Sequence, residues 1–356
     1  MPRLTCVSLF SGCGGLDLGL RRAGFRIVAA MDNDSLAIES HRANFKGTHL
    51  FEGSVSDFGL KDLPKRMPAR VDLLAGGPPC PPFSKSRFYR KDKPRALEDP
   101  NGLETITGYF DVLEWLSPRA FLLENVPGLA YGVHQDALMY VEDRAERAGY
   151  RTEWQILNAA NYGVPQIRER FFMIGVREGH IHWPGPTHAQ DPAGDLLSLQ
   201  RLPWMTAGEA IGDLDTEEMA NDAGHVAGGK DRELLIEIPP GDNYLFFTEE
   251  RGYPDPKFKW RSRYWSFLLK LSPDRPSWTI QARRSNNMGP LHWRNRILRI
   301  EEVKRLQTFP DDWILTGKVD AQWRQVGNAV PPLLAEHLGR AIAGTLEDEG
   351  KGDGKG

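Results

Sequence analysis

Cysteines, long apolar runs and a large excess of one charge are scarce or missing in this chain of 356 residues. Three cysteines are too few for a disulfide framework, and no Cys and His lie at the spacing of a zinc site. No run approaches the roughly 18 consecutive apolar residues of a membrane span. The first residues lack the pattern of a signal peptide. We therefore expect a cytoplasmic protein without a membrane segment or a metal site.

The overall charge hides a strong local asymmetry. The formal net charge is only -3, with 40% hydrophobic and 26% charged residues, a composition typical of globular proteins. Residues 205–256 hold 13 acids and 3 Lys or Arg, whereas residues 257–299 hold 11 Lys or Arg and one acid. A second basic cluster covers residues 85–95. Solvated surface charge explains any one such run, but two of them favour a polyanion-binding surface.

Strand and helix patterns alternate through the first half of the chain. Expected strands cover residues 4–10, 25–31, 71–75, 119–123, 151–158 and 170–176, and expected helices cover 16–23, 35–45, 105–116 and 135–148. Strands separated by helices predict a parallel, doubly wound α/β sheet. After about residue 177, Pro and Gly become frequent and the alternation is lost until a helix at 331–343.

A glycine-rich turn follows the first expected strand. Gly12, Gly14 and Gly15 lie between a strand and a helix, where glycines let the backbone approach a ligand closely. Asp17 stands where a dinucleotide fingerprint needs its third glycine, which disfavours an NAD(P)-dependent oxidoreductase. Asp32 ends the second strand, where an acid binds a ribose diol. The pattern favours an adenosine-type cofactor such as S-adenosylmethionine, although a tight turn alone would also need glycines.

Chemically reactive residues follow three further strands. Cys80 lies in a loop with two prolines on each side, which stiffens the backbone around a nucleophilic thiol. Glu124 ends another strand at the same sheet edge, where burial would raise its pKa and allow it to donate a proton. Alternation places Gln166, Arg168 and Arg170 on one face of an extended stretch. A structural cysteine and an edge-strand ion-pair ladder are the alternatives for these residues.

Seven motifs, in order along the chain, resemble those of the DNA (cytosine-5)-methyltransferases. They are Phe10-Ser11-Gly12-Cys13-Gly14-Gly15-Leu16, Asp32, Gly77-Pro78-Pro79-Cys80, Glu124-Asn125-Val126, Gln166-x-Arg168-x-Arg170, Arg296 with Glu302-x-x-Arg305-Leu306-Gln307-Thr308-Phe309-Pro310, and Gln325-Val326-Gly327-Asn328-Ala329-Val330-Pro331-Pro332. The resemblance covers the whole chain except roughly residues 180–280, where this family keeps its variable target-recognition region. Two positions depart from the family pattern: Pro81 replaces a frequent Gln, and Ser54-Val55 replaces a frequent Asp-Ile pair that contacts adenine.

The resemblance implies a Rossmann-like S-adenosylmethionine-dependent methyltransferase fold with a smaller, irregular target-recognition domain. It implies a catalytic and cofactor-binding domain at 1–182, a recognition domain at 183–321, a returning segment at 322–346 and a flexible tail at 347–356. The expected partner is double-stranded DNA in the cytoplasm of a bacterium or archaeon, on the nucleoid, with a cognate restriction or defence complex and no membrane.

The resemblance also implies a mechanism and a set of site residues. Cys80 attacks C6 of a flipped-out cytosine, Glu124 holds N3 and the exocyclic amine, and Arg168 holds O2, with Arg170 beside them. S-Adenosyl-L-methionine is converted to S-adenosyl-L-homocysteine. The implied cofactor contacts are Phe10, Gly12, Cys13, Gly14, Gly15, Asp32, Asn33, Ser54, Val55, Pro78, Asn328, Ala329 and Val330. The implied DNA contacts are Ser84, Lys85, Arg87, Gln166, Arg261, Arg263, Arg283, Arg284 and Arg294.

Two other functions remain open from the sequence. A tRNA cytosine-5 methyltransferase would share the catalytic motifs, but about 100 residues separate the Gln-x-Arg-x-Arg motif from the basic run, and this long insertion favours DNA. A catalytically inactive DNA-binding module on the same fold is disfavoured because Cys80, Glu124 and Arg168 are all present.

Overall fold

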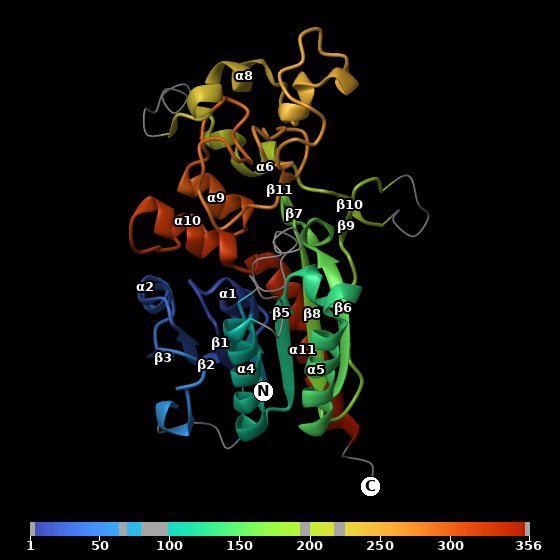
Figure 1. Cartoon of the computed structure of the whole chain (residues 1–356). Coiled ribbons are helices and arrows are strands. Elements are labelled where there is room, and N and C mark those ends of the chain that lie inside the picture. The colour runs from blue at the N-terminus through green and yellow to red at the C-terminus, as the bar shows by residue number, and fades with distance from the viewer. Residues whose placement is uncertain (1–3, 64–69, 80–98, 193–199, 217–224, 353–356) are drawn as a thin grey trace.

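A computed structural model of the chain describes residues 4–63, 70–79, 99–192, 200–216 and 225–352. Figure 1 shows a sheet with flanking helices in the lower part of the molecule and a less regular region, built mainly from residues after 200, above it. Within the described ranges, no helix combines the length and the apolar character that a membrane crossing requires.

One seven-stranded sheet forms the centre of the lower part, in the order β3-β2-β1-β4-β5-β8-β6. Its strands are β1 (Thr5–Leu9), β2 (Arg26–Asp32), β3 (His49–Glu52), β4 (Leu73–Gly76), β5 (Ala120–Asn125), β6 (Arg151–Asn158) and β8 (Glu169–Val176). The helices around it are α1 (Gly15–Arg22), α2 (Ser35–Asn44), α4 (Pro100–Leu116), α5 (Gln135–Arg147) and α11 (Pro332–Gly352). The six expected strands are present, and β3 is an additional short strand that the sequence pattern missed.

The expectation of an entirely parallel sheet is wrong at one strand. Strand β8 runs antiparallel to both of its neighbours, β5 and β6. Only the short segment between Asn158 and Glu169 joins β6 to β8, and a parallel connection needs a crossover of a dozen or more residues. The chain therefore folds straight back, and the first residues of β8 reach the edge at which the parallel strands end.

Alternating side chains of the strands enter two cores on opposite faces of the sheet. Cys6 of β1 packs in the core that contains the apolar residues of α1 and α11, whereas its neighbour Val7 packs in the core formed with α4 and α5. Figure 1 shows α4 and α5 in front of the sheet and α11 behind it. Helices on both faces make the sheet doubly wound, as expected.

The upper region has little regular structure. Its short elements are β9 (His188–Ala189), β10 (Leu202–Pro203), α6 (Ala207–Ile211), α8 (Arg232–Glu237) and β11 (Ser277–Trp278), and β11 pairs with β7 (Gln166–Ile167) of the lower part. Aromatic rings supply much of its core, as where Tyr244 and Phe258 meet edge to face with centroids 5.6 Å apart. Helices α9 (Ile300–Leu306) and α10 (Val319–Asn328) lie between this region and the sheet (Figure 1).

Two expected boundaries in the last part of the chain fall inside helices. The boundary between residues 321 and 322 cuts α10, which begins at Val319. The tail expected to be flexible from residue 347 begins as helix, because α11 continues to Gly352. Leu346 is buried and its carbonyl accepts a hydrogen bond from Arg119, so the end of this helix is anchored against the sheet domain.

Candidate active site

The candidate site lies at the edge of the sheet where β1, β4 and β5 end. Strands β1 and β4 are neighbours, and the strand order reverses between them. In open α/β sheets, ligands bind in the crevice at such a reversal. The glycine-rich turn follows β1, the loop that leads to Cys80 follows β4, and Glu124 lies near the end of β5. Three of the predicted motifs therefore meet at one edge.

Asp32 organises the turn after β1. Its carboxylate accepts hydrogen bonds from the backbone amides of Gly12 at 2.8 Å and Asp34 at 2.9 Å. Burial raises the pKa of Asp32, and the hydrogen bonds from Asp34 and Gly12 oppose this rise. Gly12 has φ +55° and open space where a side chain would project. The turn thus leaves room beside a carboxylate that has further acceptor capacity.

Two observations indicate that the residues of this turn could bind S-adenosylmethionine. The Ser11 hydroxyl is buried and has no hydrogen-bond partner within the described structure, so a ligand could satisfy it. Gly14, with φ 90°, precedes α1 and provides no side-chain cap, which leaves backbone amides at the helix N-terminus to receive a carboxylate. When bound, this cofactor supplies an electrophilic methyl group on its sulfonium.

The segment from Asn328 to Val330 packs directly on the glycine-rich turn. A Cβ atom on Gly15 would lie 2.5 Å from the carbonyl oxygen of Val330 and 2.9 Å from Cβ of Ala329, so only glycine permits this contact. Cys13 is fully buried, and burial raises the pKa of its thiol to about 12. Cys13 therefore contributes backbone and packing and not a thiolate.

The remaining expected cofactor contacts lie along the same crevice. Phe10 adopts φ 53° where β1 ends, and its amide faces the sulfur of Met31 at 3.5 Å. Asn33 is exposed beside Asp32, whereas Pro78 is buried in the loop after β4. Ser54 and Val55 lie in the loop that follows β3.

Glu124 and Arg170 form the charged pair at the centre of the site. Nε of Arg170 lies 3.0 Å from Oε1 of Glu124, and the two side chains are 14% and 7% exposed. Burial raises the pKa of Glu124, while the charges of Arg170 and Arg168 oppose the rise. The antiparallel course of β8 is what brings Arg170 to the end of β5.

The loop after β4 is held against this pair. A Cβ atom on Gly77 would lie 2.5 Å from Oε2 of Glu124, so the backbone passes the carboxylate at close range. The side-chain amide of Asn125 donates to the carbonyl oxygen of Pro78 at 3.3 Å. These contacts direct the chain that enters the Cys80 loop towards Glu124. Four predicted site residues, Cys80, Ser84, Lys85 and Arg87, lie outside the described residues.

The expected roles of Arg168 and Gln166 are not what the structure indicates. The guanidinium of Arg168 donates to the carbonyl oxygens of Ile280, Gly327 and Ala329 at 2.8–3.1 Å. Arg168 therefore joins the upper region and the end of α10 to the sheet, and Arg170 is the arginine that contacts Glu124.

Gln166 was expected to bind DNA but is fully buried. Its amide nitrogen donates to Gln307 Oε1 and to the carbonyl oxygen of Leu306, and its own oxygen accepts from the amide of Ile280. A side chain with these buried partners links the two regions and offers no exposed surface for the expected DNA contact.

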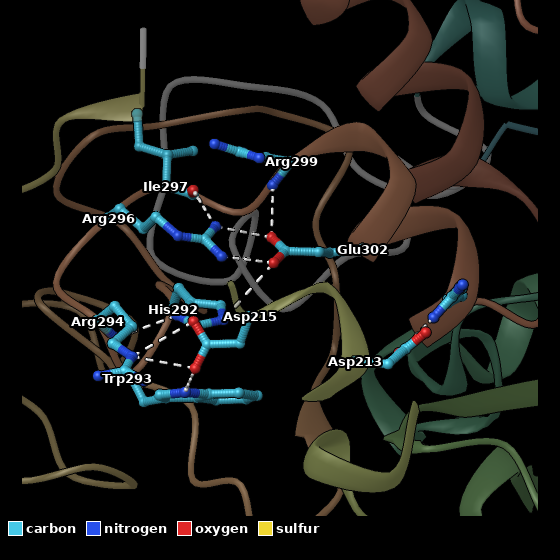
Figure 2. Close-up of polar contacts among 10 residues, drawn as sticks. Asp213, Asp215, His292, Trp293, Arg294, Arg296, Ile297, Arg299 and Glu302 are labelled. Carbon is cyan, nitrogen blue, oxygen red and sulfur yellow. Dashed lines mark hydrogen bonds and ion pairs between the residues drawn. The ribbon is translucent and has the colours of Figure 1, made fainter. Parts of the chain in front are cut away.

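The five arginines expected to face DNA differ in their surroundings. Arg261, Arg263 and Arg283 are exposed. Arg284 lies 3.8 Å from Asp320, and Nε of Arg294 lies 3.0 Å from Asp215. Figure 2 shows Arg294 directed at Asp215, which also accepts a hydrogen bond from the ring nitrogen of Trp293. The acidic segment thus supplies a partner for part of the basic one.

A buried ion pair fixes the start of α9 beside this contact. Arg296 donates to both carboxylate oxygens of Glu302, at 2.9 and 2.6 Å, and the amide of Arg299 donates to the same carboxylate at 2.7 Å (Figure 2). Burial lowers the pKa of the neighbouring His292 to about 3, so this histidine is neutral. The network fixes the loop that carries Arg294.

Exposed aromatic residues were not predicted as part of the site. Trp260, Tyr264, Trp265 and Trp278 are 37–73% exposed on the upper region. Trp278 also lines a pocket of 460 Å³ with Val126, Tyr131, Ile167, Glu169 and Thr279, among others. Two of its lining residues, Val126 and Glu169, lie within two positions of Glu124 and Arg170 in the sequence. The run of aromatic and basic residues at 258–265 was the available signal for a surface that stacks on bases.

Known proteins resemble this chain along nearly its whole length. The family model for C-5 cytosine-specific DNA methylase matches residues 4–344. The type II methyltransferase M.SacI of Streptomyces achromogenes is 38% identical over 367 residues, covering 95% of this chain and 92% of the relative. The type II methyltransferase M1.HphI of Haemophilus parahaemolyticus is 32% identical over 349 residues, with 95% and 86% covered.

Solved structures share the fold. The crystal structure of a putative DNA modification methyltransferase encoded within an E. coli prophage has a TM-score of 0.63 at 21% identity, covering 97% of this chain and 99% of that one. The S. pombe Dnmt2 methyltransferase has a TM-score of 0.62 at 18% identity, with 98% and 100% covered. The Rossmann-like methyltransferase architecture expected from the sequence is confirmed.

Proposed function

The chain belongs to the C-5 cytosine-specific DNA methylase family, and from this premise we propose how its own residues perform the reaction. The protein is a DNA (cytosine-5-)-methyltransferase that takes its methyl group from S-adenosyl-L-methionine. The tRNA alternative is set aside, because the matching family model describes a C-5 cytosine-specific DNA methylase and both sequence relatives are named as type II methyltransferases.

Cytosine C5 is a poor nucleophile while the ring is aromatic. In the proposed mechanism, the thiolate of Cys80 adds to C6, and the electron pair of the C5–C6 double bond moves towards C4 and N3. The proton of Glu124 goes to N3 as this charge develops. C5 then takes the methyl group. A water molecule takes the C5 proton, the Cys80 sulfur departs as a thiolate, and N3 returns its proton to Glu124, which restores the C5–C6 double bond and releases neutral 5-methylcytosine. The stacked duplex hides these atoms, so the base must leave the helix.

The ion pair of Glu124 with Arg170 is the observation that carries this assignment. It joins a buried acid, whose pKa burial raises, to a cation, and the backbone of Gly77, three residues before Cys80 in the sequence, passes this carboxylate closely. We assign the O2 contact to Arg170 in place of Arg168, because Arg170 reaches the carboxylate that would hold N3. Charge that develops on O2 would be stabilised by this guanidinium.

The region from 183 to the start of α10 is proposed to recognise the DNA sequence. The exposed Arg261, Arg263 and Arg283 supply positive charge, and the aromatic residues around Trp265 supply stacking surfaces. The acidic segment 205–256 would be repelled by phosphates and would face away, except where Asp215 holds Arg294.

The cellular role that we propose is DNA marking in a restriction-modification system. Both reported sequence relatives are bacterial proteins named as type II methyltransferases. We accordingly propose that the protein acts in the bacterial cytoplasm, on nucleoid DNA, with a cognate nuclease as the functional counterpart.

Bisulfite sequencing of DNA from cells that express the protein tests the function. Protected cytosines at one recurring sequence are expected, and they should be absent from cells that express Cys80→Ala at the same level. Uniform conversion of every cytosine in both strains would reject the assignment. Protection scattered without a recurring sequence would instead reject the recognition role of the upper region.

A further inference from the structure

A short loop after β3 forms the outer end of the cofactor crevice. The amide of Gly53 donates to the backbone carbonyl of Asp32 at 3.0 Å, so the loop lies directly beside the ribose acid. At the end of β2, Asp32 has the glycine-rich turn after β1 on one side and the end of β3 on the other. A cofactor whose amino-acid end is held at the glycine-rich turn and whose ribose is held by Asp32 therefore extends its base towards the opposite neighbour of β2. In this sheet that neighbour is β3, and the loop is residues 53–57.

Helix α4 approaches this loop unusually closely. A Cβ atom on Gly108 would lie 2.5 Å from Cγ1 of Val55, so glycine is required for the contact. Val55 is 3% exposed and fixes the loop against the helix. Glu104 lies four residues before Gly108 and therefore on the same face of α4. The close approach places a carboxylate over the loop.

The carboxylate of Glu104 is held by two serines of the loop. Its Oε1 accepts hydrogen bonds from the hydroxyls of Ser56 at 3.1 Å and Ser54 at 3.3 Å, and the two hydroxyl oxygens are 2.9 Å apart. A carboxylate has about four acceptor positions, so the second oxygen retains capacity for a further donor. Glu104 is also exposed, which leaves it accessible to a ligand.

We propose that Glu104 accepts a hydrogen bond from the exocyclic amine of the cofactor's adenine, with Ser54 and Ser56 orienting it. This inference rests on the proposed cofactor site. Ser54 stands where the resembling family frequently has an aspartate, and a neutral hydroxyl is a weaker acceptor than a carboxylate. A carboxylate from a different element, α4, restores the negative acceptor at this end of the crevice. Glu104 is thus a specificity-determining residue for the adenine base.

Calorimetry with two ligands separates this role from a structural one. The ligands are S-adenosylhomocysteine and its analogue without the 6-amino group, and the proteins are the wild type, Glu104→Ala and Glu39→Ala. Glu39 is an exposed glutamate on α2 and serves as the matched control. We expect Glu104→Ala to lower the affinity for S-adenosylhomocysteine by about 10–100-fold, because a hydrogen bond to a charged group is lost. The analogue should bind the wild type and Glu104→Ala equally.

Each other outcome has a definite meaning. An equal loss of affinity for both ligands in Glu104→Ala would show that Glu104 only supports the loop. Unchanged affinity for S-adenosylhomocysteine would show that Glu104 does not contact the cofactor. Either result would overturn this inference and leave the proposed cofactor site unaffected. Failure of the wild type to bind S-adenosylhomocysteine would reject the cofactor site as well. Adding Ser54→Asp to Glu104→Ala should recover most of the affinity, because the carboxylate returns from the loop side. Thermal melting confirms that each variant is folded.

Discussion

The sheet domain and the upper region are stabilised by different interactions. In the sheet, backbone hydrogen bonds join the strands, and two apolar cores cover its faces. In the upper region, strands of two residues are the longest found among the described residues, and side-chain pairs fix the loops. Regular structure therefore positions the chemistry, whereas individual polar contacts shape the surface proposed to recognise DNA.

Two buried carboxylates make this contrast concrete. Both oxygens of Glu302 are taken up by Arg296, and the Arg299 amide adds a further donor. Among the residues that the structure describes, Glu124 forms an ion pair with Arg170 alone, and it lies at the edge of the crevice with a pKa that burial raises. The carboxylate of Glu302 stabilises the fold, whereas burial of Glu124 favours the protonated form that the proposed mechanism uses. Three single substitutions and one set of five test the contrast between the two regions, in decreasing order of expected effect.

Cys80→Ala is expected to abolish methyl transfer while leaving cofactor binding and the melting temperature unchanged. No other group in the proposed mechanism can add to C6. Transfer of a labelled methyl group to DNA measures the loss. Wild-type protein should also form a covalent complex with DNA that contains 5-fluorocytosine, and Cys80→Ala should not. Turnover by this variant at a rate near that of the wild type would show that the reaction does not proceed through a covalent bond to Cys80.

Glu124→Gln is expected to lower the rate by about 10²–10⁴, the usual contribution of a general acid. Burial raises the pKa of Glu124, so the acid form persists to higher pH than for an exposed glutamate. Activity of the wild type should fall as the pH rises through this pKa, because the proton donor is lost. A pH profile of kcat/KM measures both effects. The descending limb should be missing in Glu124→Gln, and its persistence there would assign it to another group.

Glu302→Gln is expected to destabilise the fold by about 3–5 kcal/mol, because Arg296 would remain buried without its counter-charge. The matched control is Glu336→Gln, which removes a partly exposed pair with Arg340 on α11 and should cost less than about 1 kcal/mol. Urea unfolding measures both. Similar losses for the two variants would mean that the upper region does not depend on its buried ion pair.

Alanine substitutions of Arg261, Arg263, Arg283, Arg284 and Arg294 should have the smallest effects. Loss of an arginine that reads a base should reduce the free energy of DNA binding by about 1–3 kcal/mol and relax the sequence preference at one base pair. Loss of an arginine that contacts a phosphate should weaken binding to all sequences alike and reduce the salt dependence of binding. We expect the weakest change in specificity for Arg294, because Asp215 already holds it. DNA binding at several salt concentrations, with maps of methylated sites, distinguishes the classes. If all five variants behave like the wild type, DNA binds elsewhere.

The sequence by itself determined the sheet domain to a large extent. Apolar runs that end in Gly12, Asp32 and Glu124 predicted both the strands and the edge at which the site lies, because the carboxyl ends of parallel strands meet. These are local patterns, which depend on short stretches of chain. The same patterns left β3 unrecognised, since its four residues are half-buried or exposed and lack a clear apolar run.

Only the tertiary structure decided which charged residues belong to the chemistry. Arg168 and Arg170 are equivalent by alternation, but the antiparallel course of β8 places Arg170 against Glu124 and points Arg168 at carbonyl oxygens of distant segments. Gln166 was likewise buried by residues more than a hundred positions away. Glu104 entered the cofactor crevice because Gly108 lets α4 approach the loop after β3. Such pairings depend on packing between remote segments, and no local pattern encodes them.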